Sequence, residues 1–268
     1  MSDISYDGLK ILIDVLENDG GLVNHLVKNT LFFHPGIVQR QAACMLAAVQ
    51  RGERLPVRFS TKDVYYADKG CKGQPLHLSN RSAAAERSKT DNIYTSVRSG
   101  VRIEIDWDGN KSVRSVIKGC TGEIVGEGAR NTIRNYMISH IWGKTDNPFF
   151  FTALWNIALT PQHCSFILDK PDDKYRQISD IKGLFKAICW ELYHPNELMK
   201  EKDLLKKKPD EQMLEKARCF IGQKQLTFIP AIPSRSGFPG SDDGGPEVRV
   251  RCPFWDYSKY CGYLSKCP

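Results

Sequence analysis

The 268-residue sequence lacks any apolar run long enough to cross a membrane. A membrane-spanning helix needs roughly 18 or more uninterrupted apolar residues, and no window of the chain reaches that length. The N-terminus, MSDISYDGLKILIDVLENDG, also lacks the basic start followed by an apolar run that is typical of a secretory signal peptide. These two absences predict a cytoplasmic protein.

The nine cysteines include no CxxC pair, the spacing that many structural zinc sites use. Their number is odd, six of them are scattered, and there is no export signal, so mostly reduced thiols are expected. The last three, Cys252, Cys261 and Cys267, lie close together in an aromatic tail. A structural zinc site in that tail is one interpretation, and small buried or free thiols are the one we favour.

The chain also lacks internal repeats and a strong excess of one charge. Its 38 basic and 31 acidic residues give a net charge of +7. This mild basic excess suits a polyanionic partner such as nucleic acid without proving one. The glycines between positions 119 and 128 do not form a dinucleotide-binding fingerprint, because no strand–loop–helix unit with a later acid surrounds them.

What the sequence does contain predicts an α+β protein with three regions. Residues 1–50 are expected to be helical, 51–220 to form an α+β core, and 221–268 to form an irregular Gly/Pro-rich segment followed by the aromatic, cysteine-containing tail. The helices expected from apolar spacing cover 22–33, 37–49, 178–193, 196–208 and 211–220. The polar, basic stretch 68–98 is expected to be a long loop, either a DNA-backbone contact or a solvated excursion.

Alternating residues over 101–107 predict a strand, and 112–119 is expected to return beside it across a turn at 108–110. Glu104 and Asp106 then lie on one face of this hairpin. Metal binding by the two carboxylates is one interpretation, but pairing with Arg114 or Lys118 explains them more simply.

The most informative stretch covers residues 134–170. Asn135–Trp142 is expected to be a strand that carries His140 near its end, before a polar turn. An apolar segment with Asn156 inside it follows, and Thr160-Pro161 has the form of a helix start, with the helix running to about Asp169. Such an order suits phosphodiester hydrolysis, which needs a base to deprotonate water, a group to fix that base, and a cation on the phosphate.

The segments SHIW at 139–142 and NIALTP at 156–161 resemble the ββα-metal, or HNH, nuclease motif over about 35 residues. The resemblance implies that His140 is the general base and that Asn156 braces the loop and orients it. The third motif position falls near Ser165, with His163 two residues earlier and Asp169 one turn later as suitable ligands. Ser139 stands where the motif usually has a metal-binding acid, and the paired-cysteine zinc knuckles of many HNH proteins are missing.

The expected function is therefore that of a metal-dependent DNA endonuclease, of restriction or defence type, with Mg or Mn favoured over structural zinc. His163 is the expected metal ligand, and Arg130, Arg134 and Lys144 are the expected DNA contacts, although the two arginines also suit a solvated strand edge. A palindromic target would imply a homodimer. Two alternatives remain open: a nucleic-acid-binding protein that keeps the scaffold without catalysis, as Ser139 and Ser165 suggest, and a protein-interaction module that uses the tail at 254–264.

Overall fold

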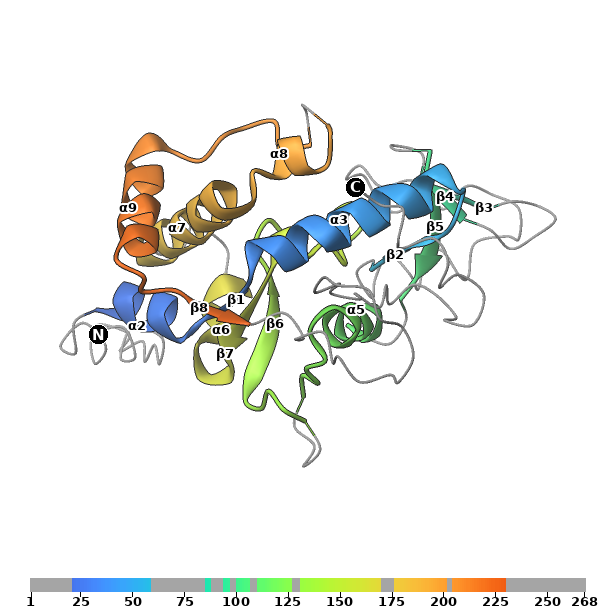
Figure 1. Cartoon of the computed structure of the whole chain (residues 1–268). Helices are drawn as coiled ribbons and strands as arrows, with labels where there is room; N and C mark the ends of the chain where they lie inside the picture. The colour runs from blue at the N-terminus through green and yellow to red at the C-terminus, as the bar shows by residue number, and fades with distance from the viewer. Residues whose placement is uncertain are drawn as a thin grey trace, which may run out of the picture.

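The computed structural model describes residues 21–58, 85–87, 94–96, 100–106, 110–126, 131–169, 176–201 and 204–229 (Figure 1). Helices and strands are mixed along these residues, as the predicted α+β class requires. None of the helices in the described ranges is long and apolar enough to cross a membrane. The tail with Cys252, Cys261 and Cys267, the residue Arg130 and most of the basic stretch 68–98 lie outside the described residues.

One four-stranded sheet carries the 134–170 stretch. Its order is β6 (Tyr136–His140), β7 (Ile157–Pro161), β1 (Leu31–Phe33) and β8 (Thr227–Ile229). The β6–β7 and β7–β1 pairs are antiparallel, whereas β1 and β8 are parallel. Strands from all three regions expected from the sequence therefore join one sheet.

The second sheet has the order β2 (Leu55–Val57), β5 (Arg102–Ile105), β4 (Tyr94–Ser96) and β3 (Ala85–Arg87). The alternation predicted for β5 is confirmed, because Ile103 and Ile105 are buried while Arg102 and Glu104 are exposed. β2 pairs with β5 in parallel. Directly after β2, the backbone amide of Arg58 donates to the carbonyl of Thr145 at 2.8 Å, so the chain that leaves this sheet contacts the 134–170 stretch.

The helices are α2 (Leu22–Asn29), α3 (Pro35–Gln50), α5 (Lys111–Thr121), α6 (Gln162–Asp169), α7 (Arg176–Tyr193), α8 (Pro195–Leu198) and α9 (Glu211–Gly222). The blue helix α3 runs from the β1 sheet towards β2 and spans the space between the two sheets (Figure 1). Its start is capped by His34, whose Nδ1 accepts from the amide of Gly36 at 3.2 Å. Inside the core, the buried Gln41 side chain donates to the carbonyl of Thr152 at 3.2 Å and accepts from the amide of Leu154 at 3.3 Å. The middle of α3 therefore fixes the backbone that precedes Asn156.

The predicted return strand over 112–119 is wrong, because this segment is helix α5. Its buried residues Val113, Val116, Ile117 and Cys120 follow helical spacing. Asp106 starts the helix by accepting from the amide of Ser112 at 2.7 Å. The carboxylate of Asp106 therefore acts at a helix start rather than in a pair with Glu104.

Two predicted helices are also shorter than expected. The helix expected over 22–33 ends at Asn29, and residues 31–33 form β1 instead. The helix expected over 196–208 is limited to α8. From within α8, the side chain of Asn196 accepts from the amide of Leu205 at 2.9 Å and donates to its carbonyl at 3.2 Å, and residues 204–208 are not helical.

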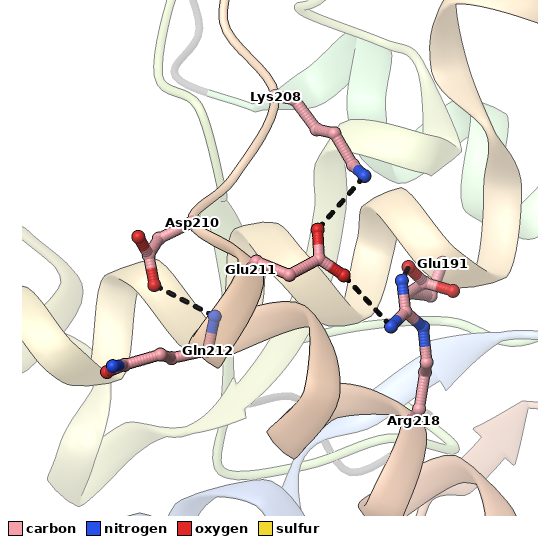
Figure 2. Close-up of polar contacts among 6 residues, drawn as sticks. All are labelled: Glu191, Lys208, Asp210, Glu211, Gln212 and Arg218. Atoms are coloured by element: carbon pink, nitrogen blue, oxygen red, sulfur yellow. Dashed lines mark hydrogen bonds and ion pairs between the residues drawn. The ribbon is translucent and has the colours of Figure 1, made fainter.

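Helices α7 and α9 pack together, and Figure 2 shows the polar contacts at their exposed edge. Arg218 on α9 contacts Glu191 on α7 at 3.0 Å and Glu211 at 3.1 Å. Lys208 contacts the other oxygen of Glu211 at 3.2 Å. The hydrogen bonds from Lys208 and then from Arg218 lower the pKa of Glu211 below its usual value. Exposed ion pairs contribute little to stability, so the apolar faces of the two helices dominate this packing.

The same view shows the start of α9, where Asp210 accepts from the amide of Gln212 at 2.9 Å (Figure 2). Replacing Asp210 by alanine should lower the free energy of unfolding by about 1 kcal/mol, because one helix-end amide loses its acceptor. Asp210→Ser, which keeps an acceptor oxygen, should retain most of that stability. Urea denaturation measures both variants, and an equal loss in the two would contradict a capping role.

Candidate active site

The candidate site is built on an antiparallel hairpin followed directly by a helix. β6 and β7 pair from Tyr136 opposite Pro161 to His140 opposite Ile157, and α6 starts at Gln162 and packs against both strands. The predicted order of strand, loop, strand and helix is therefore present. Pro161 ends β7 rather than opening α6, so the helix begins one residue later than expected.

His140 lies at the end of β6, and its ring is held by one stacking contact and one hydrogen bond. The ring stacks on Phe151, with centroids 5.6 Å apart and planes 13° apart, and Nε2 lies 2.9 Å from the Phe151 carbonyl. A carbonyl only accepts hydrogen bonds, so Nε2 carries the proton in the neutral ring. This tautomer presents the lone pair of Nδ1 as a proton acceptor.

The surroundings of His140 favour its neutral form. Burial is the main cause that lowers its pKa to about 4, and the positive charge of Arg58 adds to the shift. The hydrogen bond to Phe151 acts in the opposite direction but is outweighed. His140 is therefore an uncharged acceptor at neutral pH, and it is a weaker base than an ordinary histidine.

Asn156 is fully buried and holds the loop between the two strands. Its Oδ1 accepts from the amide of Trp142 at 2.9 Å, and its Nδ2 donates to the carbonyls of Gly143 and Phe150 at 3.2 and 3.0 Å. Phe150 adjoins Phe151, whose carbonyl contacts His140. Asn156 thus acts on the histidine through the loop.

The loop side chains are packed around Trp155, which is fully buried. Trp142 and Phe150 both meet its ring edge-on, with centroids 5.6 and 4.9 Å away. The ammonium group of Lys144 lies over the Phe150 ring, 4.7 Å from its centroid. Asn147, interpreted from the sequence as a turn residue, accepts from the amide of Phe149 at 2.9 Å.

Arg58 is a neighbour of this site that sequence reasoning missed. Its backbone amide donates to the carbonyl of Thr145 at 2.8 Å, and the Thr145 hydroxyl donates to the Arg58 carbonyl at 2.9 Å. The guanidinium group donates to Asn110 at 3.1 Å. The end of β2 therefore brings a cation to the loop beside His140, and no local sequence signal indicates this.

The two expected DNA-contact residues that the structure describes, Arg134 and Lys144, lie towards opposite ends of β6. Lys144 belongs to the loop that follows His140. Arg134 is exposed and precedes β6, at the opposite end of that strand from His140. Arg130 falls among the residues that the structure does not describe.

The two positions where the resemblance implies metal ligands hold neutral hydroxyls. Ser139 is buried, and its Oγ lies 2.7 Å from Oγ1 of Thr160 in a hydroxyl–hydroxyl bond. Ser165 donates to the carbonyl of Gln162 at 3.0 Å. Mg²⁺ and Mn²⁺ prefer carboxylate, carbonyl and water oxygens. Ser139 and Ser165 therefore do not fit as ligands that hold such a cation.

His163 lies in a different cluster from His140. Its ring meets His25 of α2 edge-on, with the two Nε2 atoms 3.4 Å apart, and Cys164 completes a group whose ligand atoms all lie within 4.8 Å. Pro161, two residues before His163, pairs with Tyr136. Tyr136 lies four strand residues, or about 13 Å, from His140. His140 and Asn156 thus share one end of the hairpin and His163 lies at the other, so its expected role beside the base stays a prediction.

Comparison with known proteins gives a family without an assigned activity. The family model described as "Uncharacterised protein PM1201" matches residues 33–228. The chain belongs to this family. The protein PM1201 of Pasteurella multocida (strain Pm70) is 33% identical over 72 residues, which cover 26% of this chain and 31% of that relative. The match therefore spans about a third of the curated relative, and no solved structure matches the chain.

Removing the amide of Asn156 should destabilise the loop. Asn156→Ala leaves one partly buried amide and two carbonyls without their partner, so the free energy of unfolding should fall by about 3 kcal/mol or more. Asn147→Ala removes one acceptor from the same loop and should cost about 1 kcal/mol. Chemical denaturation of both variants tests this order, and equal losses would contradict a bracing role for Asn156.

The low pKa of His140 should appear in the pH dependence of stability. The unfolded chain takes up a proton at the ordinary histidine pKa of 6.5, whereas the folded chain does so at about 4. Stability should therefore fall as pH drops from 6.5 to 4, by about 3 kcal/mol from this group. His140→Gln keeps a donor for Phe151 without a titrating ring. Its denaturation midpoints should lack this component, and parallel curves for the two proteins would contradict the shifted pKa.

Proposed function

We propose that this protein is an HNH-type nuclease that hydrolyses phosphodiester bonds in DNA. The observation that carries the proposal is the fixed tautomer of His140, whose Nε2 is held by the Phe151 carbonyl. Nδ1 is then ready to accept a proton from water, as general-base catalysis requires.

The positive charges near His140 support a phosphate as the group that is attacked. Arg58 is close enough to shift the pKa of His140, and Lys144 lies in the loop that follows it. Cations at these places attract the DNA backbone and stabilise charge that develops on the phosphate. Arg134 would then contact the backbone further along, from the other end of β6.

The proposal includes a divalent cation, Mg²⁺ or Mn²⁺, whose chemistry in such reactions is to neutralise charge on the phosphate and acidify the attacking water. Acidified water would suit a weak base such as His140. Ser139 and Ser165 do not fit as its ligands, because each hydroxyl is neutral and engaged with a neighbour. We therefore assign no hairpin residue to hold the cation. A restriction or defence role, with a homodimer on a palindromic target, is part of the same proposal.

A second candidate is a nucleic-acid-binding protein that keeps the scaffold without cleavage. The Ser139–Thr160 hydrogen bond favours it, because a buried hydroxyl pair stands where a metal-binding acid is expected. This candidate uses the same cations, Arg58 and Lys144, but needs no base. It differs in one measurable respect, since DNA would be bound in a salt-dependent way and left intact.

Incubation of supercoiled plasmid with the full chain and Mg²⁺ or Mn²⁺ should give nicked or linear DNA. His140→Gln should slow cleavage by about 100-fold or more, because general-base catalysis contributes at least that much. His194→Asn is the matched control, an exposed histidine far along the chain whose left-handed backbone, with φ of 45°, asparagine tolerates. It should cleave as the wild type does.

Equal cleavage by the wild type and His140→Gln would overturn the role of His140. Salt-sensitive binding of the plasmid without cleavage in either cation would assign the protein to the second candidate. Neither cleavage nor binding would exclude both. Circular dichroism of each variant separates a lost base from a lost fold.

A further inference from the structure

Three side chains that suit a metal ion meet where α2 approaches the start of α6. His25 comes from the middle of α2, and His163 and Cys164 come from the first turn of α6. One imidazole nitrogen of each histidine and the Sγ atom of Cys164 all lie within 4.8 Å of one another. Among the residues that the structure describes, this is the group of histidine, cysteine or acidic side chains gathered closely enough to share an ion.

The distance between the two imidazole nitrogens matches that of two ligands on one ion. The Nε2 atoms of His25 and His163 are 3.4 Å apart. Nitrogen hydrogen bonds are most often about 2.9–3.0 Å long, so this contact is at the long limit. Two nitrogens that each bind zinc at about 2.0–2.1 Å with a tetrahedral angle are roughly 3.4 Å apart. The nitrogen spacing of 3.4 Å therefore fits coordination, and with the ring centroids 5.7 Å apart the two nitrogens face each other, so binding an ion requires both rings to rotate towards it.

The donor atoms decide which metal fits. Two imidazole nitrogens and one thiolate sulfur form a borderline-soft set that suits zinc, whereas Mg²⁺ needs oxygen ligands. We propose that His25, His163 and Cys164 form a zinc site that joins α2 to α6. The site is independent of the nuclease proposal, because it lies at the opposite end of the hairpin from His140.

The exposure of the three residues suits entry of an ion from solvent. His163 is exposed, His25 is partly exposed and Cys164 is buried, so the sulfur forms the floor of the site and the imidazoles its rim. Three protein ligands leave a fourth tetrahedral position for water or another donor. Such an ion links residues 138 positions apart in sequence, and its binding free energy adds to the stability of the folded chain.

Zinc binding can be measured on the full chain with Zn²⁺ alone, by competition with a chromogenic chelator. Wild type should bind one Zn²⁺ at this site, and Co²⁺ in its place should show the visible bands of a tetrahedral ion with a thiolate-to-metal band. His25→Ala should weaken zinc binding by more than the roughly 10–100-fold that loss of an outer-shell partner costs. Cys164→Ala should also abolish the thiolate band. The unfolding temperature of this variant without metal shows whether its fold is intact.

Three controls separate this site from other cysteines and from the proposed nuclease centre. Cys219→Ala, at an exposed cysteine of α9, and a variant with Cys252, Cys261 and Cys267 all changed to serine should bind zinc as the wild type does. His140→Gln should do the same, so failure of DNA cleavage leaves this result unaffected. The proposal is overturned if wild type binds no zinc, if His25→Ala binds it as tightly as wild type, or if the tail variant loses it.

Discussion

The site depends on the need of buried amide groups to find hydrogen-bond partners. Asn156 and Gln41 are both buried, and an unpaired amide in such surroundings costs free energy comparable to a lost hydrogen bond. Their side chains form hydrogen bonds with backbone groups between Trp142 and Leu154, and these bonds restrict the conformation of the loop. The position of the Phe151 carbonyl, and through it the tautomer of His140, follows from that constraint.

The hairpin also separates two kinds of chemistry along its length. At one end, burial and the charge of Arg58 keep His140 a neutral nitrogen base, although the Phe151 carbonyl that holds its ring acts in the opposite direction. At the other end, His163 meets nitrogen and sulfur donors. His140 and His163 therefore have different chemical surroundings, although only 23 positions in the sequence separate them. The strand length, rather than the spacing in sequence, decides which groups can act together.

Some patterns within a short window were predicted well and others were not, and contacts across long distances in sequence were missed. The 134–170 stretch shows its strand, loop and helix because its alternation, glycine turn and helix start are local signals. The segment 112–119 contains apolar residues that suit both periods, and only packing and Asp106 decide for α5. Residues such as Arg58 and His25 reach the two ends of the hairpin from 87 and 138 positions away, beyond the reach of any local pattern.

The order in which the chain emerges during synthesis has a consequence for the sheet that carries the hairpin. β1 is made early, but its two neighbours, β7 and β8, come from the middle and the end of the described chain. Until β8 arrives, the strand of Phe32 and Phe33 keeps one edge unpaired, and such an edge can pair with another copy of the chain. Folding that depends on such distant pairings is slow, so we expect this edge of the nascent chain to be prone to aggregation until β8 is in place.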